Sequence, residues 1–464
     1  MVSPEDLLGV RRGVVIAPAG CGKTQFLVGS VKVNPSGRVL VLTHTRAGVA
    51  AIRERLRKAG VAQQSFRVAT LDAWSAWLAL RFPKTSGFVP TGTAADYGGA
   101  RDAATALIRE PCFQRLLAST YARLLVDEYQ DCGNGQHAMV LALADAIPTL
   151  ALGDPMQRIF TFGPDGLPTW VSIVSSFQQS WELSRPWRWE NAGEIGFGTW
   201  ILEQRRKLLA GGSVDFSAAP PNVRWISRPP TDDTYFAIQH QAIPQKPTET
   251  VIVINSSRDR DGRHRIARGG YRLSVVERAD LPDLISWAAK LDSAVSTTRS
   301  WQVIQFAHDV MTDIDRTSIL QRLNDIRHRA APGPVTDEER ALLSLDTSSG
   351  GDGIVATLQQ LARSRERVPF RHELLEAMCQ TANLATAGRS LMAAALKVVE
   401  QRAADGRILP RRAVGSTLLL KGLEADHAVV FDADTMSSAD IYVAMSRASR
   451  TLTVVSNSFV LPRG

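Results

Sequence analysis

Cysteine is scarce in this chain of 464 residues, and the four cysteines lie far apart, at Cys21, Cys112, Cys132 and Cys379. None belongs to a CxxC pair, so the spacing argues against a zinc or iron–sulfur site and against a disulfide framework. No apolar run approaches the roughly 18 residues that a membrane-spanning helix requires. The first residues also lack the apolar core of a signal peptide. We therefore expect a cytoplasmic protein that does not enter a membrane.

Lysine is also rare: it accounts for nine of the 54 basic residues, and the other 45 are arginines. Acidic residues number 46, so the formal net charge is +8. Positive charge favours a polyanionic partner such as nucleic acid, although many basic proteins have none. Arginine suits phosphate because its planar guanidinium can donate to two oxygens at once. The charge thus indicates a class of partner without establishing it.

Short β-branched runs alternate with helical segments over the first 190 residues, which is typical of a parallel sheet with crossover helices. One intervening segment, Arg46–Lys58, has the spacing of an amphipathic helix. A second set of strands follows later in the chain. The predicted strands are Gly13–Ala17, Arg38–Thr43, Phe66–Thr70, Leu124–Asp127, Thr149–Gly153, Ser180–Leu183, Asn222–Ile226, Thr250–Asn255, Ser416–Leu420, Ala428–Asp432 and Thr451–Ser456.

Two stretches that lack strand patterns interrupt these sets, a long one within residues 281–407 and a short one near residues 76–122. Both have helical spacing. We therefore predict an α/β fold with two parallel-sheet domains, each with a helical insert. The predicted boundaries are 1–75 and 123–180 for the first domain, 76–122 for its insert, 181–291 and 408–464 for the second domain, and 292–407 for its insert.

The strongest local signal is APAGCGKT, residues 17–24, directly after a predicted strand. A glycine-rich turn lets backbone N–H groups face phosphates, and the helix N-terminus that follows adds partial positive charge. In this pattern Lys23 reaches the β- and γ-phosphates, and the Thr24 hydroxyl is a ligand of Mg²⁺. At Cys21 we favour a small tolerated side chain over a redox role. The nucleotide-binding residues predicted here are Ala19, Gly20, Cys21, Gly22, Lys23 and Thr24.

Two adjacent carboxylates end the hydrophobic strand of LLVDEYQD, residues 124–131. Asp127 can hold Mg²⁺ through water, and Glu128 can polarise the attacking water as a general base. Acid pairs at strand ends are common. The pair indicates phosphate chemistry because a P-loop precedes it.

A third polar loop follows the strand in LALGDPMQRIFTF, residues 150–162. The amide of Gln157 can contact the γ-phosphate and sense whether ATP is intact. Phe160 and Phe162 can offer flat faces to bases, and stacking contributes roughly 1–3 kcal/mol per base. A place in the hydrophobic core is the alternative for both aromatic residues.

These three motifs, in this order and spacing, resemble those of superfamily 1 DNA helicases of the UvrD/Rep/PcrA type. Other segments fall into register with the same family, and the resemblance covers nearly the whole chain apart from the inserts. The matching segments are THTRAGVAAI at 43–52 (motif Ia), TLDAWS at 70–75, LSRPWRW at 183–189 (motif IV), GGYRLSVVERADLPDLISWAAKL at 269–291, STLLLKGLEADHAVV at 416–430 (motif V) and YVAMSRAS at 442–449 (motif VI).

The resemblance implies two RecA-like domains of the P-loop NTPase fold, with ATP and Mg²⁺ bound between them. It places Arg447 at the arginine-finger position of motif VI and Arg188 at the phosphate-contacting position of motif IV. Catalysis is then assigned to Lys23, Glu128, Gln157, Arg188 and Arg447, metal binding to Thr24 and Asp127, and further nucleotide contacts to Gly422 and Glu424.

The resemblance also implies an activity, namely ATP-driven movement along single-stranded DNA in the 3′ to 5′ direction. Single-stranded DNA or a tailed duplex is therefore the expected partner. The residues assigned to this strand are Thr43, His44, Thr70, Phe160 and Phe162.

The chain departs from the family pattern in three places. No glutamine precedes the P-loop, Phe162 and Gly163 replace a Trp-Arg pair, and Leu418 replaces a histidine. Both helical inserts are short, which favours translocation over processive unwinding. The alternative is a DNA-sensing regulatory ATPase. Compact UvrD-like proteins of this size resemble the helicase-like subunit of the Gabija antiphage system, which would add an OLD-family nuclease as partner.

One basic segment, Arg258–Arg268 (RDRDGRHRIAR), belongs to none of these motifs. Its arginines can contact phosphate. A solvated loop is an equal alternative.

Overall fold

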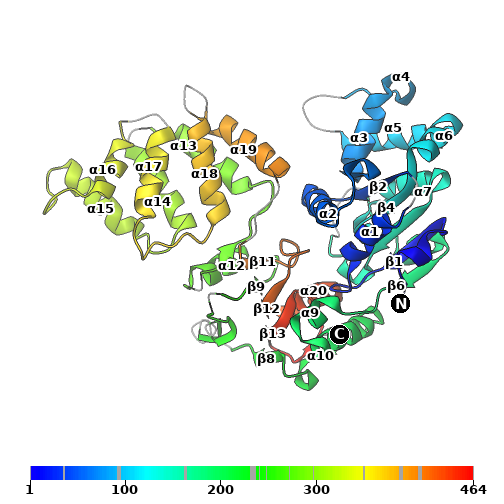
Figure 1. Cartoon of the computed structure of the whole chain (residues 1–464). Helices are drawn as coiled ribbons and strands as arrows, with labels where there is room; N and C mark the ends of the chain where they lie inside the picture. The colour runs from blue at the N-terminus through cyan, green and yellow to red at the C-terminus, as the bar shows by residue number, and fades with distance from the viewer. Residues whose placement is uncertain are drawn as a thin grey trace. The chain divides into compact units, whose positions relative to one another are not determined.

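A computed structural model describes residues 2–34, 37–90, 96–160, 165–229, 237–239, 241–246, 248–270, 272–295, 297–347, 351–385, 390–405 and 410–462. The chain divides into two compact units (Figure 1). Unit 1 comprises Met1–Ser227, Ala433–Leu452 and Ser456–Gly464, and unit 2 comprises Arg228–Asp432 and Thr453–Val455.

The first six-stranded sheet lies in unit 1 and has the strand order β3-β2-β4-β5-β1-β6. Each neighbouring pair is parallel. The carboxyl ends of β1, β4 and β5 therefore meet at one edge, where ligands bind in open α/β sheets. The strands are β1 (Arg12–Ile16), β2 (Arg38–Thr43), β3 (Phe66–Thr70), β4 (Tyr121–Val126), β5 (Thr149–Gly153) and β6 (Ser180–Glu182).

Helices cover both faces of this sheet because successive strand residues point to opposite sides. Leu40 and Leu42 pack into a core with α3, α5, α6, α7 and α8. Val39 and Val41 pack into a second core with α1, α2 and part of α10. The helices are α1 (Lys23–Lys32), α2 (Arg46–Lys58), α3 (Leu71–Arg81), α4 (Pro83–Ser86), α5 (Tyr97–Arg109), α6 (Pro111–Thr120), α7 (Asn134–Ala146), α8 (Trp170–Phe177), α9 (Trp187–Ala192), α10 (Ile195–Leu209) and α20 (Ser438–Met445).

A second six-stranded sheet has the order β10-β11-β9-β12-β13-β8. The pairs β9–β11, β9–β12 and β10–β11 are parallel. The predicted α/β class with two sheets is therefore confirmed. The strands are β8 (Val223–Ser227), β9 (Val251–Ile254), β10 (Ser274–Val275), β11 (Arg412–Gly415), β12 (Ala425–Val430) and β13 (Ala448–Ser456), and β7 (Val214–Asp215) pairs separately with β14 (Val460–Leu461).

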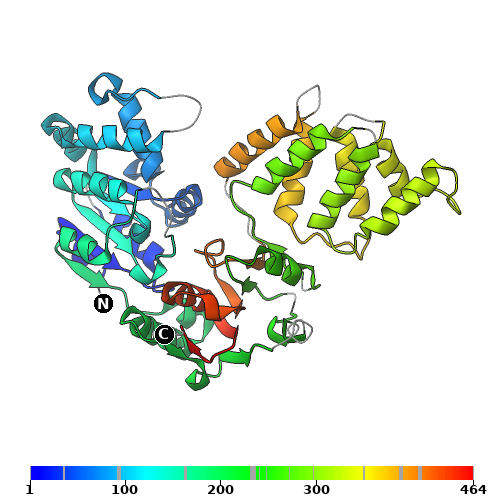
Figure 2. The ribbon, with the colours of Figure 1, turned by 180° about the vertical axis from the view of Figure 1, so that it is seen from behind.

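Seven helices of unit 2 form a bundle, which Figure 1 and Figure 2 show from opposite sides. The bundle has a hydrophobic core of its own. Leu284, Ile304 and Leu374 are among its fully buried residues. The helices are α13 (Pro282–Ser293), α14 (Thr297–Val310), α15 (Arg316–Arg327), α16 (Asp337–Ser344), α17 (Gly351–Leu361), α18 (His372–Leu384) and α19 (Leu391–Asp405), and α12 (Arg260–Arg268) precedes them.

One predicted strand is wrong. Residues 417–420 form turns, in which the Leu420 N–H donates to the Ser416 carbonyl, and the strand is the preceding Arg412–Gly415. Leu420 is fully buried, and a short apolar run of this kind does not distinguish a strand from a buried turn. Within the described part of the chain, no helix has both the length and the apolar character needed to cross a membrane.

Candidate nucleotide site

The P-loop connects β1 to α1 and leaves a helix N-terminus open to an anion. Gly20 and Gly22 have φ angles of 75° and 84°, in the left-handed region that favours glycine. Gly22 is the N-cap of α1 and offers no side-chain acceptor to the first turn. The backbone N–H groups of that turn can therefore bind phosphate oxygens. Thr24 lies in the same turn, half-buried.

Lys23 meets the two carboxylates that follow β4. Its Nζ lies 2.9 Å from Asp127 Oδ1 and also forms an ion pair with Glu128. Burial lowers the pKa of Lys23, but the charges of Asp127 and Glu128 outweigh it, so this pKa lies above its ordinary value. Burial raises the pKa of Asp127, and Lys23 opposes that shift. Three residues predicted to act on phosphate thus lie together in unit 1.

Glu128 has a strained backbone and a defined side-chain position. Its φ of 55° is unfavourable for a residue with a side chain. Gln130 Nε2 donates to Glu128 Oε2 at 2.5 Å, and Gln130 Oε1 accepts from the Asp154 N–H at 3.1 Å. Gln157 Nε2 in turn donates to Asp154 Oδ2 at 3.2 Å. Gln130, which sequence reasoning missed, therefore connects the Glu128 carboxylate to the loop that carries Gln157.

A buried ion pair supports this loop from α10. Arg205 donates to Asp154 Oδ1 from Nε at 3.1 Å and from Nη2 at 2.8 Å. The two side chains are 3% and 1% exposed, so the pair is shielded from solvent. Nη1 of Arg205 also donates to Glu182 Oε1 at 2.7 Å. No local motif indicated Arg205, because its partners are 51 and 23 residues away in the sequence.

The YVAMSRAS segment, residues 442–449, contacts residues 17–24 through a tyrosine. The Ala19 N–H donates to the Tyr442 hydroxyl at 2.8 Å. Burial raises the pKa of Tyr442, so its hydroxyl keeps the proton. One P-loop N–H group that the sequence assigned to nucleotide therefore has a protein partner here. Sequence reasoning missed Tyr442, although it begins the matched YVAMSRAS string.

Both arginines predicted to contact phosphate also lie in unit 1. Arg188 donates through Nη1 to the Ser446 carbonyl, and its backbone N–H donates to the Gly20 carbonyl at 3.1 Å. Arg447 is 2% exposed. It donates from Nε to the Val443 carbonyl at 2.8 Å and from Nη2 to Ser446 Oγ at 3.0 Å. Part of the guanidinium of Arg447 is therefore bound by its own segment.

Two tryptophans that the sequence did not single out pack on the P-loop. A side-chain carbon at Gly20 would lie 2.6 Å from the Trp189 ring, and one at Gly22 would lie 3.0 Å from the Trp187 ring. Trp187 is 39% exposed, and the Arg185 guanidinium lies 3.5 Å from its ring centroid. Arg185 therefore covers one face of the Trp187 ring beside the glycines. Burial raises the pKa of Cys21 to about 12, so its thiol is protonated and poorly reactive.

Gly422 and Glu424 lie in unit 2, in the turn between β11 and β12. Gly422 has a φ of 84°, and Glu424 is exposed. Their assignment to nucleotide stays a prediction.

The residues assigned to the DNA strand have varied surroundings. Thr43 is 1% exposed at the end of β2. The Thr70 hydroxyl accepts from the Ala73 N–H at 3.1 Å and caps α3. Phe160 is 37% exposed, which fits a surface role better than a core role. Phe162 lies outside the described residues.

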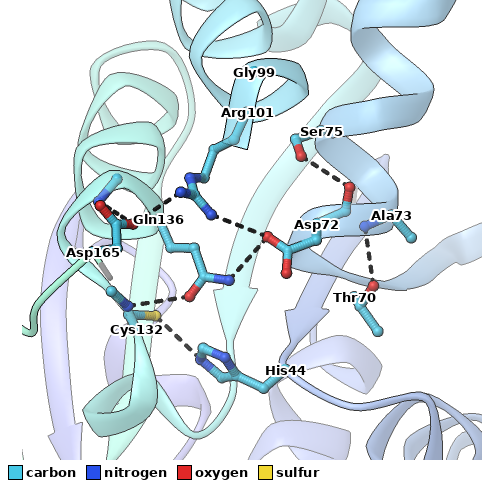
Figure 3. A network of polar contacts seen from close by, with 12 residues as sticks. His44, Thr70, Asp72, Ala73, Ser75, Gly99, Arg101, Cys132, Gln136 and Asp165 are labelled. Carbon is cyan, nitrogen blue, oxygen red and sulfur yellow. Dashed lines mark hydrogen bonds and ion pairs between the residues drawn. The ribbon is translucent and has the colours of Figure 1, made fainter. Parts of the chain in front are cut away.

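His44 adjoins a polar network, which Figure 3 shows. Its Nε2 lies 3.4 Å from Cys132 Sγ. Nearby, Asp72 accepts from Gln136 at 3.0 Å, and Arg101 bridges Asp72 and Asp165 at 3.4 and 2.9 Å. These contacts tie the start of α3 to α5 and to the start of α7.

The N-terminal part of the chain matches a known family model. Residues 7–163, about a third of the chain, match the family model of an AAA domain. No curated protein matches the chain. One similar solved structure is an arterivirus nonstructural protein 10 (helicase) in complex with DNA. Its identity is 11% over 96% of this chain, with a TM-score of 0.37. The present chain spans only 60% of that viral chain.

Proposed function

We propose that this protein is an ATP-dependent translocase or helicase of the UvrD-like type, acting on single-stranded DNA in the 3′ to 5′ direction. The observation that carries the proposal is the ion-paired cluster of Lys23, Asp127 and Glu128 beside an uncapped helix N-terminus. That arrangement is the one phosphoryl transfer requires: a cation and N–H groups for the phosphates, and a carboxylate for the attacking water.

The donor set fits a triphosphate with Mg²⁺. Thr24 and Asp127 would hold the ion, which would neutralise charge on the phosphates. A phosphate that enters the P-loop offers Lys23 new partners in place of its carboxylates. Glu128 then loses a charged neighbour and becomes available to accept a proton from water. Gln130 keeps the Glu128 carboxylate oriented during this exchange.

Movement along DNA requires that the nucleotide state reach the strand-binding surface. The path that we propose runs from Glu128 through Gln130 and Asp154 to Gln157, and then to Phe160 three residues later. Stacking of a base on Phe160 would change as this loop shifts. His44, Thr43 and Thr70 are proposed to border the same strand.

A second candidate function is a DNA-sensing regulatory ATPase that unwinds little and works with a nuclease, as in an antiphage complex. The hydrogen bonds that Arg447 makes within its own segment favour this candidate. An arginine finger must leave such partners to reach a phosphoryl group, which would make hydrolysis depend on an added trigger.

Strand displacement distinguishes the two candidates. Duplexes with a 3′ tail, a 5′ tail or no tail are incubated with ATP, Mg²⁺ and either the wild-type protein or Lys23→Ala. The first candidate predicts displacement of the 3′-tailed substrate by the wild type alone. Stimulated ATP hydrolysis without displacement on any substrate would favour the regulatory ATPase. Displacement by Lys23→Ala at the wild-type rate would refute both.

A further inference from the structure

A cavity of about 490 Å³ lies in unit 2. The residues that line it are far from the P-loop along the chain. Its walls come from α12, α13 and α14, together with Arg371 just before α18. The arginine-rich segment at residues 258–268 supplies one wall, since residues 260–268 form α12 rather than a loop. Ile266 and Ala267 fix this helix to the core, while Arg260, Arg265 and Arg268 are exposed.

Some of the lining charges are already neutralised. Arg371 is buried and donates to both carboxylate oxygens of Glu277, at 2.5 and 2.9 Å. Asp283 accepts from Arg371 at 2.5 Å and also pairs with Arg260. These four residues form an ionic network beside the cavity, so their charges largely neutralise one another.

Three other lining cations form no ion pair with any described carboxylate: Arg265, Arg268 and Lys290. Arg268 donates to the His308 carbonyl at 2.9 Å, and Lys290 lies 4.2 Å from the centre of the Trp287 ring. The cavity is also lined by Asp261 and Asp309. These two carboxylates do not balance the three cations, so the surface keeps an excess of positive charge. An excess of cations in a concave site attracts anions from solution.

The same positive charges contribute to lowered pKa values of the two histidines in the cavity. Burial lowers the pKa of His264 to about 3, and repulsion from Arg371, Arg260, Arg263 and Arg268 adds to the effect. The pKa of His308 is also lowered, by burial and then by Arg268 and Arg316. Both rings are therefore neutral at pH 7, and each can offer an N–H group to an anion.

We propose that this cavity binds a phosphate group of the nucleic-acid backbone, held by Arg265, Arg268 and Lys290. Arginine side chains match the geometry of phosphate oxygens, and lysine adds a flexible point charge. All three side chains are exposed at the rim, so a phosphate within a polymer can reach them. The inference rests on the proposed function, which brings nucleic acid to this protein, and adds a contact in unit 2.

The test removes charge from the rim without touching the ionic network of Arg260, Glu277, Asp283 and Arg371. Arg265→Gln/Lys290→Gln is compared with the wild type in binding of a single-stranded oligonucleotide, followed by fluorescence anisotropy at several salt concentrations. The slope of log K against log salt is negative, and each lost phosphate contact reduces its magnitude by about 0.7–1. The matched control is Arg363→Gln/Arg365→Gln, which removes two exposed arginines of unit 2 outside the cavity and should leave the slope unchanged.

A second measurement identifies the source of the phosphate. The ring signals of His264 are followed by NMR while oligonucleotide or inorganic phosphate is added at equal ionic strength. A shift with oligonucleotide that the rim variant lacks supports the proposal. A shift with inorganic phosphate alone overturns the assignment to nucleic acid.

The binding experiment also separates this inference from the proposed function. A wild-type protein that binds oligonucleotide, together with a rim variant of identical slope, would overturn the cavity assignment alone. A wild-type protein that binds no oligonucleotide would overturn the proposed function and this inference with it.

Discussion

Replacing Arg205 with methionine should strongly destabilise unit 1, because it leaves the buried carboxylate of Asp154 without a counter-charge. The guanidinium supplies two hydrogen bonds to Asp154 Oδ1, and the carboxylate is 1% exposed. In the variant, Asp154 would keep only two neutral donors, the N–H of Met156 and the amide of Gln157. Removing one partner of a buried ion pair costs about 3–5 kcal/mol, and we expect Arg205→Met to fall in this range.

The second carboxylate partner of Arg205, which is exposed, provides a matched control. Glu182 accepts from Arg205 Nη1 at 2.7 Å, but its side chain is 44% exposed. An exposed pair contributes only about 0–1 kcal/mol, so Glu182→Gln should have little effect. Arg205→Met/Asp154→Asn should recover part of the loss, because it removes the buried charge while keeping an acceptor for the Met156 N–H.

Amide hydrogen exchange of β5 and β1 measures these changes locally, since both strands border the loop that Asp154 begins. We expect lower protection in Arg205→Met, nearly wild-type protection in Glu182→Gln, and intermediate protection in the double variant. Equal, small effects of Arg205→Met and Glu182→Gln, below about 1 kcal/mol, would refute the claim that the buried pair supports this loop.

Three further predictions concern single side chains. Arg447→Ala should keep ATP affinity within about tenfold while DNA-stimulated hydrolysis falls at least about a hundredfold, and near-wild-type turnover would remove the arginine-finger assignment. Phe160→Ala should weaken single-strand binding in a gel shift by roughly 1–3 kcal/mol, whereas unchanged affinity would place the strand elsewhere. The pKa of His264 is about 3 in the folded state, below its ordinary 6.5. As the pH falls below 6.5, the unfolded state therefore binds more protons than the folded state. Stability to guanidinium should therefore decrease from pH 7 to pH 5, and His264→Gln should reduce that decrease; an identical pH dependence in the variant would refute it.

The strands of unit 1 could be predicted because they are buried apolar runs bounded by turn residues. Arg38–Thr43, Phe66–Thr70 and Thr149–Gly153 have the predicted limits. The same reasoning placed one strand wrongly at Ser416–Leu420. Apolar content there reflects burial of a turn, and only the three-dimensional arrangement shows that β11 ends at Gly415.

The residues proposed to act on the nucleotide were easier to predict than the residues that hold their loops in place. Lys23 and Asp127 carry local signals, a glycine-rich turn and an acid pair at a strand end, and the structure brings them within 2.9 Å. Arg205 lies in no local motif, and the YVAMSRAS string that contains Tyr442 does not indicate the partner of its hydroxyl. Their contacts join residues 51 and 423 positions apart, so they follow from tertiary packing that a linear pattern does not encode.

ATP hydrolysis with and without single-stranded DNA, measured for the wild type and Glu128→Gln, tests the central claim most directly. Lys32→Ala is the matched control, because this exposed lysine lies on the same helix as Lys23. We predict hydrolysis that DNA stimulates in the wild type and in the control. Glu128→Gln should bind ATP but hydrolyse it at least about a hundredfold more slowly. Stimulated hydrolysis at the wild-type rate in Glu128→Gln, or no hydrolysis in the wild type, would contradict the account.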